Sequence, residues 1–263
     1  MLPVLLYHNL EQSSFQFQSK PVIELPYILP VAQFEQQIAY LAEQGFQSIL
    51  PRQLQDPLPD KPVIISFDNG HESQRRLALP ILQKYGFKAV FFITTDYLEI
   101  PDYLNMNDVK LLNEMEMEIG SHGVSHQLLD DVPNIEVEHE LEESQRILSG
   151  LLGKPVVSFS IPNGQLHAEM RTLAILHYKQ VFGGRFGFYQ AQKGRFNIPR
   201  LAIKRNLSFT QFQSLLQQDP KLLRQFYCQD WVLFIAKFIL GKAAYDISRS
   251  ALLTWLQKRA MRT

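Results

Sequence analysis

The stretch Val63–Gly70 reads VIISFDNG, and it contains both a strand and the polar residues that end it. Its first five residues, Val63–Phe67, are largely apolar, which is typical of a short buried strand. Asp68, Asn69 and Gly70 follow together, a composition that also suits a plain turn. The stretch therefore predicts a buried strand that ends in a carboxylate and an amide, either in a simple turn or at a functional site.

Similar apolar runs recur on both sides of this stretch, and helix-like segments separate several of them. The strand-like runs are Val4–Tyr7, Val63–Phe67, Ala89–Ile93, Glu118–Ser121, Val156–Phe159 and Leu201–Ile203. Apolar residues spaced by three or four, as at Phe34, Ile38 and Leu41, indicate helices between them. Strands and helices that alternate in this way predict a mainly parallel sheet, either a barrel or a doubly wound layer.

Composition restricts the class of protein. The chain has 263 residues, of which 46% are hydrophobic and 20% charged, so it can bury a full core. Its formal net charge is zero, which argues against nucleic acid as a partner. Cys228 is the only cysteine, which fits a reducing compartment, and the opening MLPVLLYHNL lacks the basic start of a signal peptide. We expect a cytoplasmic protein, with membrane association left open.

The C-terminal segment differs from the rest. From Lys221 onward, eight Lys and Arg residues stand against two aspartates, so this segment carries +6 and residues 1–220 carry −6. The apolar run Trp231–Leu240 is much shorter than the roughly 20 residues of a spanning helix. We expect a barrel-like domain over 1–220 and a basic helical extension over 221–263. That extension either packs on the domain or rests on an anionic membrane or a partner.

Two further strand ends also carry polar residues. Glu118–His126 reads EIGSHGVSH, and its two histidines, His122 and His126, are spaced so that both rings can reach one Zn²⁺ ion. Ser158–Gln165 reads SFSIPNGQ, in which Pro-Asn-Gly forms either a plain turn or one that directs a backbone N–H toward a developing oxyanion. In a barrel, these strand ends meet on one face, where active sites are built.

Taken together, the segments resemble the polysaccharide deacetylases of carbohydrate esterase family 4. The TFDDG-like, HSxxH-like and RxPxG-like motifs of that family correspond to SFDNG (Ser66–Gly70), HGVSH (His122–His126) and SIPNG (Ser160–Gly164). GFKAVFFI at Gly86–Ile93 also matches, and the LLYH opening looks most like the exopolysaccharide-deacetylase branch. The resemblance covers residues 2–205. It implies a distorted (β/α) barrel and metal-dependent removal of N-acetyl groups from an N-acetylhexosamine polysaccharide or its precursor.

The resemblance also implies a role for each matching position. Asp68 corresponds to the catalytic base, and the backbone amide of Asn163 to an oxyanion donor. His122 and His126 correspond to metal ligands, and Asn69 takes the place of a metal-binding aspartate. Such a site favours Zn²⁺, with Co²⁺ or Ni²⁺ as alternatives. The bound cation would lower the pKa of its water ligand and polarise the acetyl carbonyl.

The sequence departs from the family pattern at three points. Asn69 is neutral where the family has an anionic ligand, and Ser160 stands where many members have an arginine that orients the base. The late Leu-x-His element, which often supplies the general acid, is missing, so His8 and His71 become candidates for that role.

Three functions remain open: an active N-deacetylase acting on N-acetylated oligo- or polysaccharide, a catalytically silent carbohydrate-binding or assembly protein, and a hydrolase of a non-sugar amide.

Overall fold

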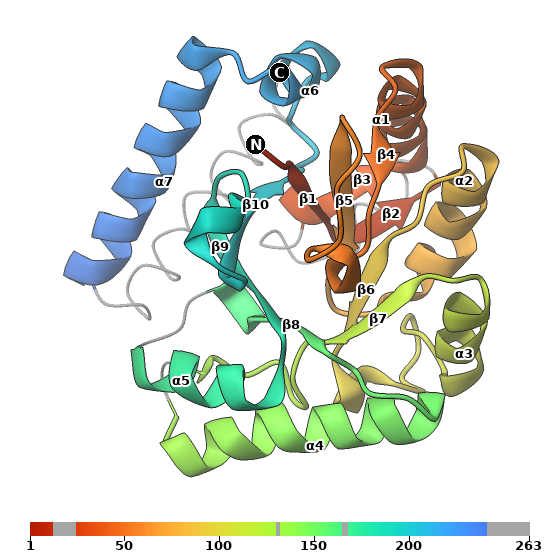
Figure 1. Cartoon of the computed structure of the whole chain (residues 1–263), viewed down its shortest axis with the longest axis vertical. Helices are drawn as coiled ribbons and strands as arrows, with labels where there is room; N and C mark the ends of the chain where they lie inside the picture. Colours follow the sequence, from red (N-terminus) through yellow and green to blue (C-terminus); the bar gives the residue numbers. More distant parts are fainter. Residues whose placement is uncertain (13–24, 130–131, 165–167, 241–263) are drawn as a thin grey trace, which may run out of the picture.

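Parallel strands form a closed barrel at the centre of the protein. A computed structural model describes residues 1–12, 25–129, 132–164 and 168–240. Within these residues, seven strands follow the order β1-β10-β9-β8-β7-β6-β5, and β1 pairs with β5 to close the ring (Figure 1). Their bounds are β1 Val4–Tyr7, β5 Pro62–Phe67, β6 Val90–Ile93, β7 Glu118–Ser121, β8 Ser158–Ser160, β9 Gln180–Phe186 and β10 Phe196–Ala202.

Helices surround this barrel, and short strands lie beside it. The helices are α1 Val31–Glu43, α2 Leu79–Lys84, α3 Met106–Glu114, α4 Asn134–Leu152, α5 Ala168–His177, α6 Phe209–Leu216 and α7 Pro220–Leu240. The short strand β4 (Gln47–Ser48) adds to β5, while β2 (Asn9–Glu11) pairs with β3 (Ile28–Pro30) in a separate small sheet. In Figure 1, α1 to α5 lie around the outside of the strands, so each strand buries one face under helices and the other inside the barrel.

The structure confirms all six predicted strands and adds a seventh, β9, to the barrel. β8 begins two residues later than the sequence predicts, and β10 begins at Phe196 rather than Leu201. β9 was not expected, because its Gly-Gly pair interrupts the apolar pattern. The choice between a barrel and an open sheet is settled by β1, whose Leu5 pairs with Leu201 on one side and with Ile65 on the other.

Aromatic side chains fill the layer between the barrel and α1. Phe34 of α1 contacts the ring of Tyr7 edge-on, with 5.0 Å between centroids, and Phe67 stacks on Phe91 at the same separation. Phe34 and Ile38 are fully buried, as the helical spacing predicts. Rings at these separations add roughly 0.5–1.5 kcal/mol per pair beyond area burial. This layer holds the C-terminal ends of β1 and β5 in place.

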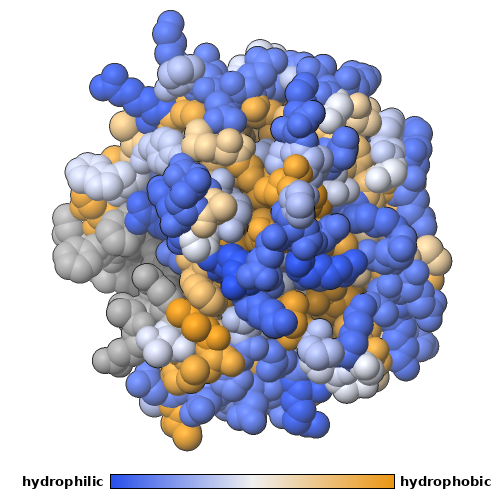
Figure 2. Space-filling view, viewed as in Figure 1, coloured by the Kyte–Doolittle hydropathy of each residue, from blue (hydrophilic) through white to orange (hydrophobic). Residues whose placement is uncertain are grey.

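α7 packs against the end of β9. The ring of Phe226 stacks on Phe186, and Arg185 pairs with Asp230 at 2.9 Å. Residues 241–263 lie outside the described residues, so the boundary at 220 between domain and extension stays a prediction. Among the helices that the structure describes, none is both long and apolar enough to cross a membrane. The side of the molecule drawn in Figure 1 is mostly hydrophilic around its rim, and hydrophobic residues lie between hydrophilic ones near its centre (Figure 2).

Candidate active site

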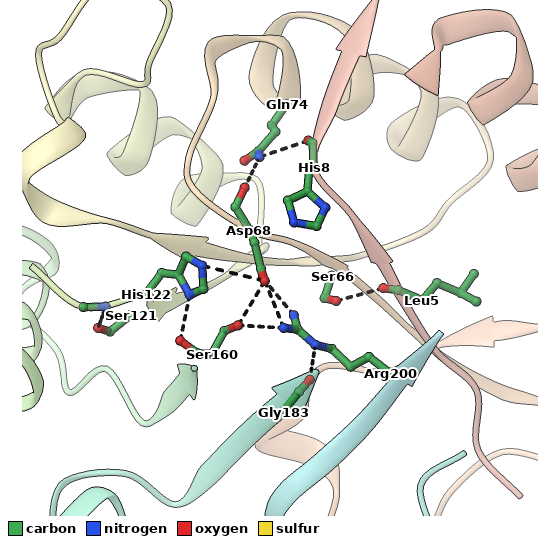
Figure 3. A network of polar contacts seen from close by, with 11 residues as sticks. Leu5, His8, Ser66, Asp68, Gln74, Ser121, His122, Ser160, Gly183 and Arg200 are labelled. Carbon is green, nitrogen blue, oxygen red and sulfur yellow. Dashed lines mark hydrogen bonds and ion pairs between the residues drawn. The ribbon is translucent and has the colours of Figure 1, made fainter. Parts of the chain in front are cut away.

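The alternation of side chains along the strands selects the residues that enter the barrel. In β5, Ile65 and Phe67 pack under the helices, whereas Ile64 belongs to the second hydrophobic cluster, which lines the inside of the barrel. Successive strand residues point to opposite faces. Ser66 and Asp68 therefore follow Ile64 toward the interior, and Figure 3 shows the Asp68 carboxylate at the centre of a polar network.

The neighbouring strands bring further polar side chains to this position. In β10, Ile198 lies in the interior cluster, so Arg200, two residues later, also points inward. Ser160, the last residue of β8, is fully buried, and so is nearly all of His122, the residue after β7. Because all the strands are parallel, their carboxyl ends meet at one end of the barrel.

Asp68 and Arg200 form a bidentate ion pair. The two guanidinium Nη atoms of Arg200 donate to the two carboxylate oxygens of Asp68 at 2.8 and 2.9 Å, and both side chains are at least 96% buried. The Ser160 hydroxyl donates to Asp68 Oδ2 at 3.1 Å. Arg200 Nε donates to the carbonyl of Gly183 at 2.9 Å. A second support comes from Gln74, whose amide donates to the backbone carbonyl of Asp68 at 2.6 Å.

These contacts decide the ionisation of Asp68. Burial by itself would raise the pKa of the carboxyl, but Arg200 and His122 outweigh burial and hold that pKa well below its usual range. The carboxylate is therefore ionised at any working pH. It is also a weak proton acceptor while both of its oxygens remain paired with Arg200.

His122 and His126 both lie beside this carboxylate. His122 donates its Nδ1 proton to the backbone carbonyl of Ser160 at 2.7 Å, which leaves Nε2 with a lone pair 3.8 Å from Asp68 Oδ2. Burial lowers the pKa of His122 to about 3 and also lowers that of His126, so both imidazoles are neutral near pH 7. Their ring centroids are 4.9 Å apart.

The donor atoms at this end of the barrel fit a divalent cation. Neutral imidazoles whose other nitrogen is hydrogen-bonded are the usual state of histidine ligands. Asn69 adds an amide whose Oδ1 is buried and has no hydrogen-bond partner among the described residues. Among all residues that the structure describes, no group of three His, Cys, Asp or Glu side chains is arranged to bind a metal ion. A cation here would therefore depend on the Asn69 amide together with His122 and His126.

His8 and Asn163 reach the same end of the barrel from other strands. His8 follows β1, its ring lies 4.8 Å from that of Tyr27, and burial lowers its pKa to about 4. Its Nδ1 atom is buried without a hydrogen-bond partner among the described residues. Asn163 lies in the turn Pro162–Gly164 after β8, where it is exposed and has a left-handed φ of 58°. The ring of His71 lies 5.8 Å from that of Tyr103, and its Nδ1 atom is hydrogen-bonded to the Ser73 hydroxyl at 2.8 Å.

A tight backbone contact shapes the Asn163 turn. A Cβ atom on Gly164 would clash with the backbone of Gly184 in β9, so only glycine lets the turn approach that strand. Gly164 also has a left-handed φ of 74°. Gly184 is therefore required by this contact, whereas a Cβ atom on Gly183, the other member of the Gly-Gly pair, would clash with the Asn197 side chain.

Arg200 is the main functional residue that sequence reasoning missed. The third motif has Ser160 where an arginine is usual, and the guanidinium that pairs with Asp68 comes instead from β10, 40 residues later. The available signal was a charged residue inside the largely apolar stretch NIPRLAI, because a charge within a buried strand requires a partner. Pairing between β1 and β10 brings this strand beside β1, from where the Arg200 side chain reaches Asp68.

Comparison with known proteins places the chain among related sequences and folds. A family profile described as polysaccharide deacetylase matches residues 55–181, a range that contains all three motifs. YxkH of Bacillus subtilis is 22% identical over 223 residues, which cover 82% of this chain and 76% of YxkH. A poly-beta-1,6-N-acetyl-D-glucosamine N-deacetylase of Escherichia coli is 32% identical over 72 residues, which cover 25% of this chain and 11% of that protein.

Solved structures share the fold. The Streptococcus pyogenes deacetylase PplD superposes with a TM-score of 0.74 at 24% identity, covering 82% of this chain and 96% of PplD. IcaB from Ammonifex degensii gives a TM-score of 0.70 at 20% identity, covering 82% of this chain and 95% of that one. The expected distorted (β/α) barrel is confirmed. The profile spans just under half of this chain, and together with YxkH and the solved deacetylases it shows that the chain is similar to the polysaccharide deacetylases.

Proposed function

We propose that the protein hydrolyses the N-acetyl groups of an N-acetylhexosamine oligo- or polysaccharide with the help of a divalent cation, most simply Zn²⁺. The supporting observation is that one barrel end gathers an ionised carboxylate, two neutral imidazoles and an unpartnered buried amide oxygen. The match to the E. coli N-deacetylase, although it covers a small part of that protein, favours a polymer of N-acetylglucosamine.

His122, His126 and Asn69 would hold the cation. When bound, the cation supplies Lewis acidity toward the acetyl carbonyl and lowers the pKa of the attacking water. Asp68 accepts the proton of that water, and Arg200 keeps the carboxylate ionised and correctly oriented. The left-handed turn at Asn163 would direct the backbone N–H of that residue toward the developing oxyanion.

His8 would pass a proton to the leaving amine. Its lowered pKa leaves the imidazole neutral at pH 7, so it would first take from Asp68 the proton that Asp68 accepted from the water, and then donate that proton to the leaving amine. The unpartnered Nδ1 atom provides a place for that proton.

The test measures bound metal and acetate release separately. Purified protein is stripped, re-equilibrated with Zn²⁺, and assayed on N-acetylglucosamine oligomers. We expect about one ion per chain, lost in His126→Ala and retained in His139→Ala, whose side chain lies exposed on α4. Asp68→Asn should keep the ion and lose acetate release. Turnover that survives in Asp68→Asn would show that another group is the base.

A silent carbohydrate-binding protein is the second candidate, and two observations favour it. Both oxygens of Asp68 are occupied by Arg200, and Asn69 offers no negative charge to a cation. This candidate predicts no ion above the His126→Ala background and no acetate release, but saturable binding of the oligomers in calorimetry.

We also propose a peripheral membrane contact through residues 221–263, and hence a cytoplasmic protein that works at the membrane surface. On α7, Trp231 is 60% exposed and Val232 58%, and the segment is basic. The full chain should float with anionic phosphatidylglycerol vesicles more than with neutral ones. The double variant Trp231→Ser, Val232→Ser should lose this binding, whereas Met106→Ser, an exposed control on α3, should not. Equal flotation of all three proteins would refute the contact.

A further inference from the structure

Glu140 of α4 is a buried carboxylate that the proposed reaction does not use. Its residue exposure is 2%, although it lies on a surface helix. Its Oε2 atom accepts the backbone N–H of Val124 at 2.6 Å, and Oε1 accepts the hydroxyl of Ser125 at 2.6 Å. The backbone N–H of Ser125 lies 3.1 Å from both oxygens, and the Gln127 amide donates to Oε1 at 3.3 Å. All of these donors belong to residues 124–127, the segment that carries His126.

The segment between the two histidines is built to receive this carboxylate. Gly123 has a left-handed φ of 80°, and a Cβ atom there would lie only 2.7 Å from Glu140 Oε2. A residue with a side chain at position 123 would therefore displace the carboxylate. Gly123 stands at the second position of HGVSH, where the HSxxH-like family motif has serine, so the absence of a side chain makes room for Glu140.

The opposite side of the same segment is also held. Thr95 and Asp96 donate their backbone N–H groups to the carbonyls of Gly123 and Val124, at 3.1 and 2.9 Å. Glu140 thus binds the N–H groups of the segment while residues 95–96 bind its carbonyl groups. Without Glu140, the N–H groups of two consecutive residues would lose their acceptor.

The backbone of His126 needs such support. Its φ is +63°, in a region that residues other than glycine rarely occupy. In this conformation the His126 ring lies 4.9 Å from that of His122. A relaxed segment would carry the ring away from its partner, whereas His122 is held independently by the Ser160 carbonyl.

We propose that Glu140 is a positioning residue that fixes His126 relative to His122 and thereby sets the affinity of the site for a divalent cation. The inference rests on the proposed function, because it assumes that the two histidines bind the cation. Outer contacts that orient ligands typically change metal affinity 10- to 100-fold, and we expect a loss of that size when Glu140 is altered.

The test measures Zn²⁺ affinity by competition with a chromophoric chelator. Glu140→Gln removes both the charge and one acceptor, whereas Glu140→Asp keeps the charge and shortens the reach. Both should weaken Zn²⁺ binding at least tenfold, and Glu142→Gln, an exposed control on the same helix, should not. Gly123→Ala should weaken binding similarly, and the double variant Gly123→Ala, Glu140→Asp should lose little more than either single one, because both break the same contact.

A second measurement needs no metal. Hydrogen exchange of the stripped protein should be faster at the amides of Val124 and Ser125 in Glu140→Asp, with the rest of α4 still protected. If Glu140→Asp binds Zn²⁺ with wild-type affinity while Glu140→Gln binds it more weakly, only the charge of Glu140 matters. That result would overturn the positioning role. Wild-type affinity in every variant overturns it as well. If the unmodified protein binds no Zn²⁺, the proposed metal-dependent function fails along with the inference.

Discussion

Replacing Arg200 by methionine should expose the energetic cost of the buried charge at the centre of the site. Methionine replaces the aliphatic part of the arginine side chain and leaves the Asp68 carboxylate, whose side chain is 4% exposed, without its bidentate partner. Removing one member of a buried ion pair typically costs about 3–5 kcal/mol, because the remaining charge is uncompensated. In a domain of this size, such a loss lowers the melting temperature by on the order of 10 °C.

The loss should depend on pH, and its sign follows from the pKa of Asp68. In the native protein that pKa is lowered, so its contribution to the free energy of unfolding is present above the unfolded pKa of about 4 and is lost as pH falls below it. Without Arg200, burial dominates and raises the pKa, so the ionised carboxylate destabilises the variant as pH rises. The stability difference between the two proteins is therefore largest near pH 7 and shrinks toward pH 4.

Urea unfolding of the metal-free proteins, in the presence of chelator, measures this difference at several pH values. Arg185→Met is the control, because Arg185 forms a partly exposed ion pair with Asp230, and such pairs contribute about 1 kcal/mol or less. A deficit for Arg200→Met below about 1 kcal/mol at pH 7, or one that stays constant from pH 7 to pH 4, would refute the reasoning.

Three further variants test other parts of the structure. Ser160→Ala removes a hydroxyl that donates to Asp68, and should lower the free energy of unfolding by about 1 kcal/mol in urea titrations. Gly164→Ala places a methyl group against the backbone of Gly184, so a loss of more than about 2 kcal/mol is expected, and an unchanged thermal melt would contradict that clash. Burial raises the pKa of Glu118, so the stabilising contribution of the protonated Glu118 is lost as pH rises through that pKa. Between pH 4 and 7, Glu118→Gln should therefore gain stability relative to the native protein, as measured by denaturation at each pH.

Local patterns in the sequence predicted six of the seven barrel strands and several of the groups proposed to form the site. Apolar runs gave six strands, because a buried strand needs contiguous apolar residues. The stripe through Phe34, Ile38 and Leu41 gave α1, since those positions share one face of a helix. The polar residues after two of these strands, at Asp68 and His122, predicted where a site would form, because parallel strands end on the same side.

Only the tertiary structure decided which distant groups complete that site. The closed barrel depends on β1 pairing with two strands at once, and no local pattern reports such pairing. Arg200 reaches Asp68 only because that closure brings β10 next to β1. Glu140 likewise meets the histidine segment only because α4 packs beside β7. From sequence alone, a charged residue in a strand or helix is expected to be exposed to solvent. It can be buried only when the fold supplies a partner for its charge.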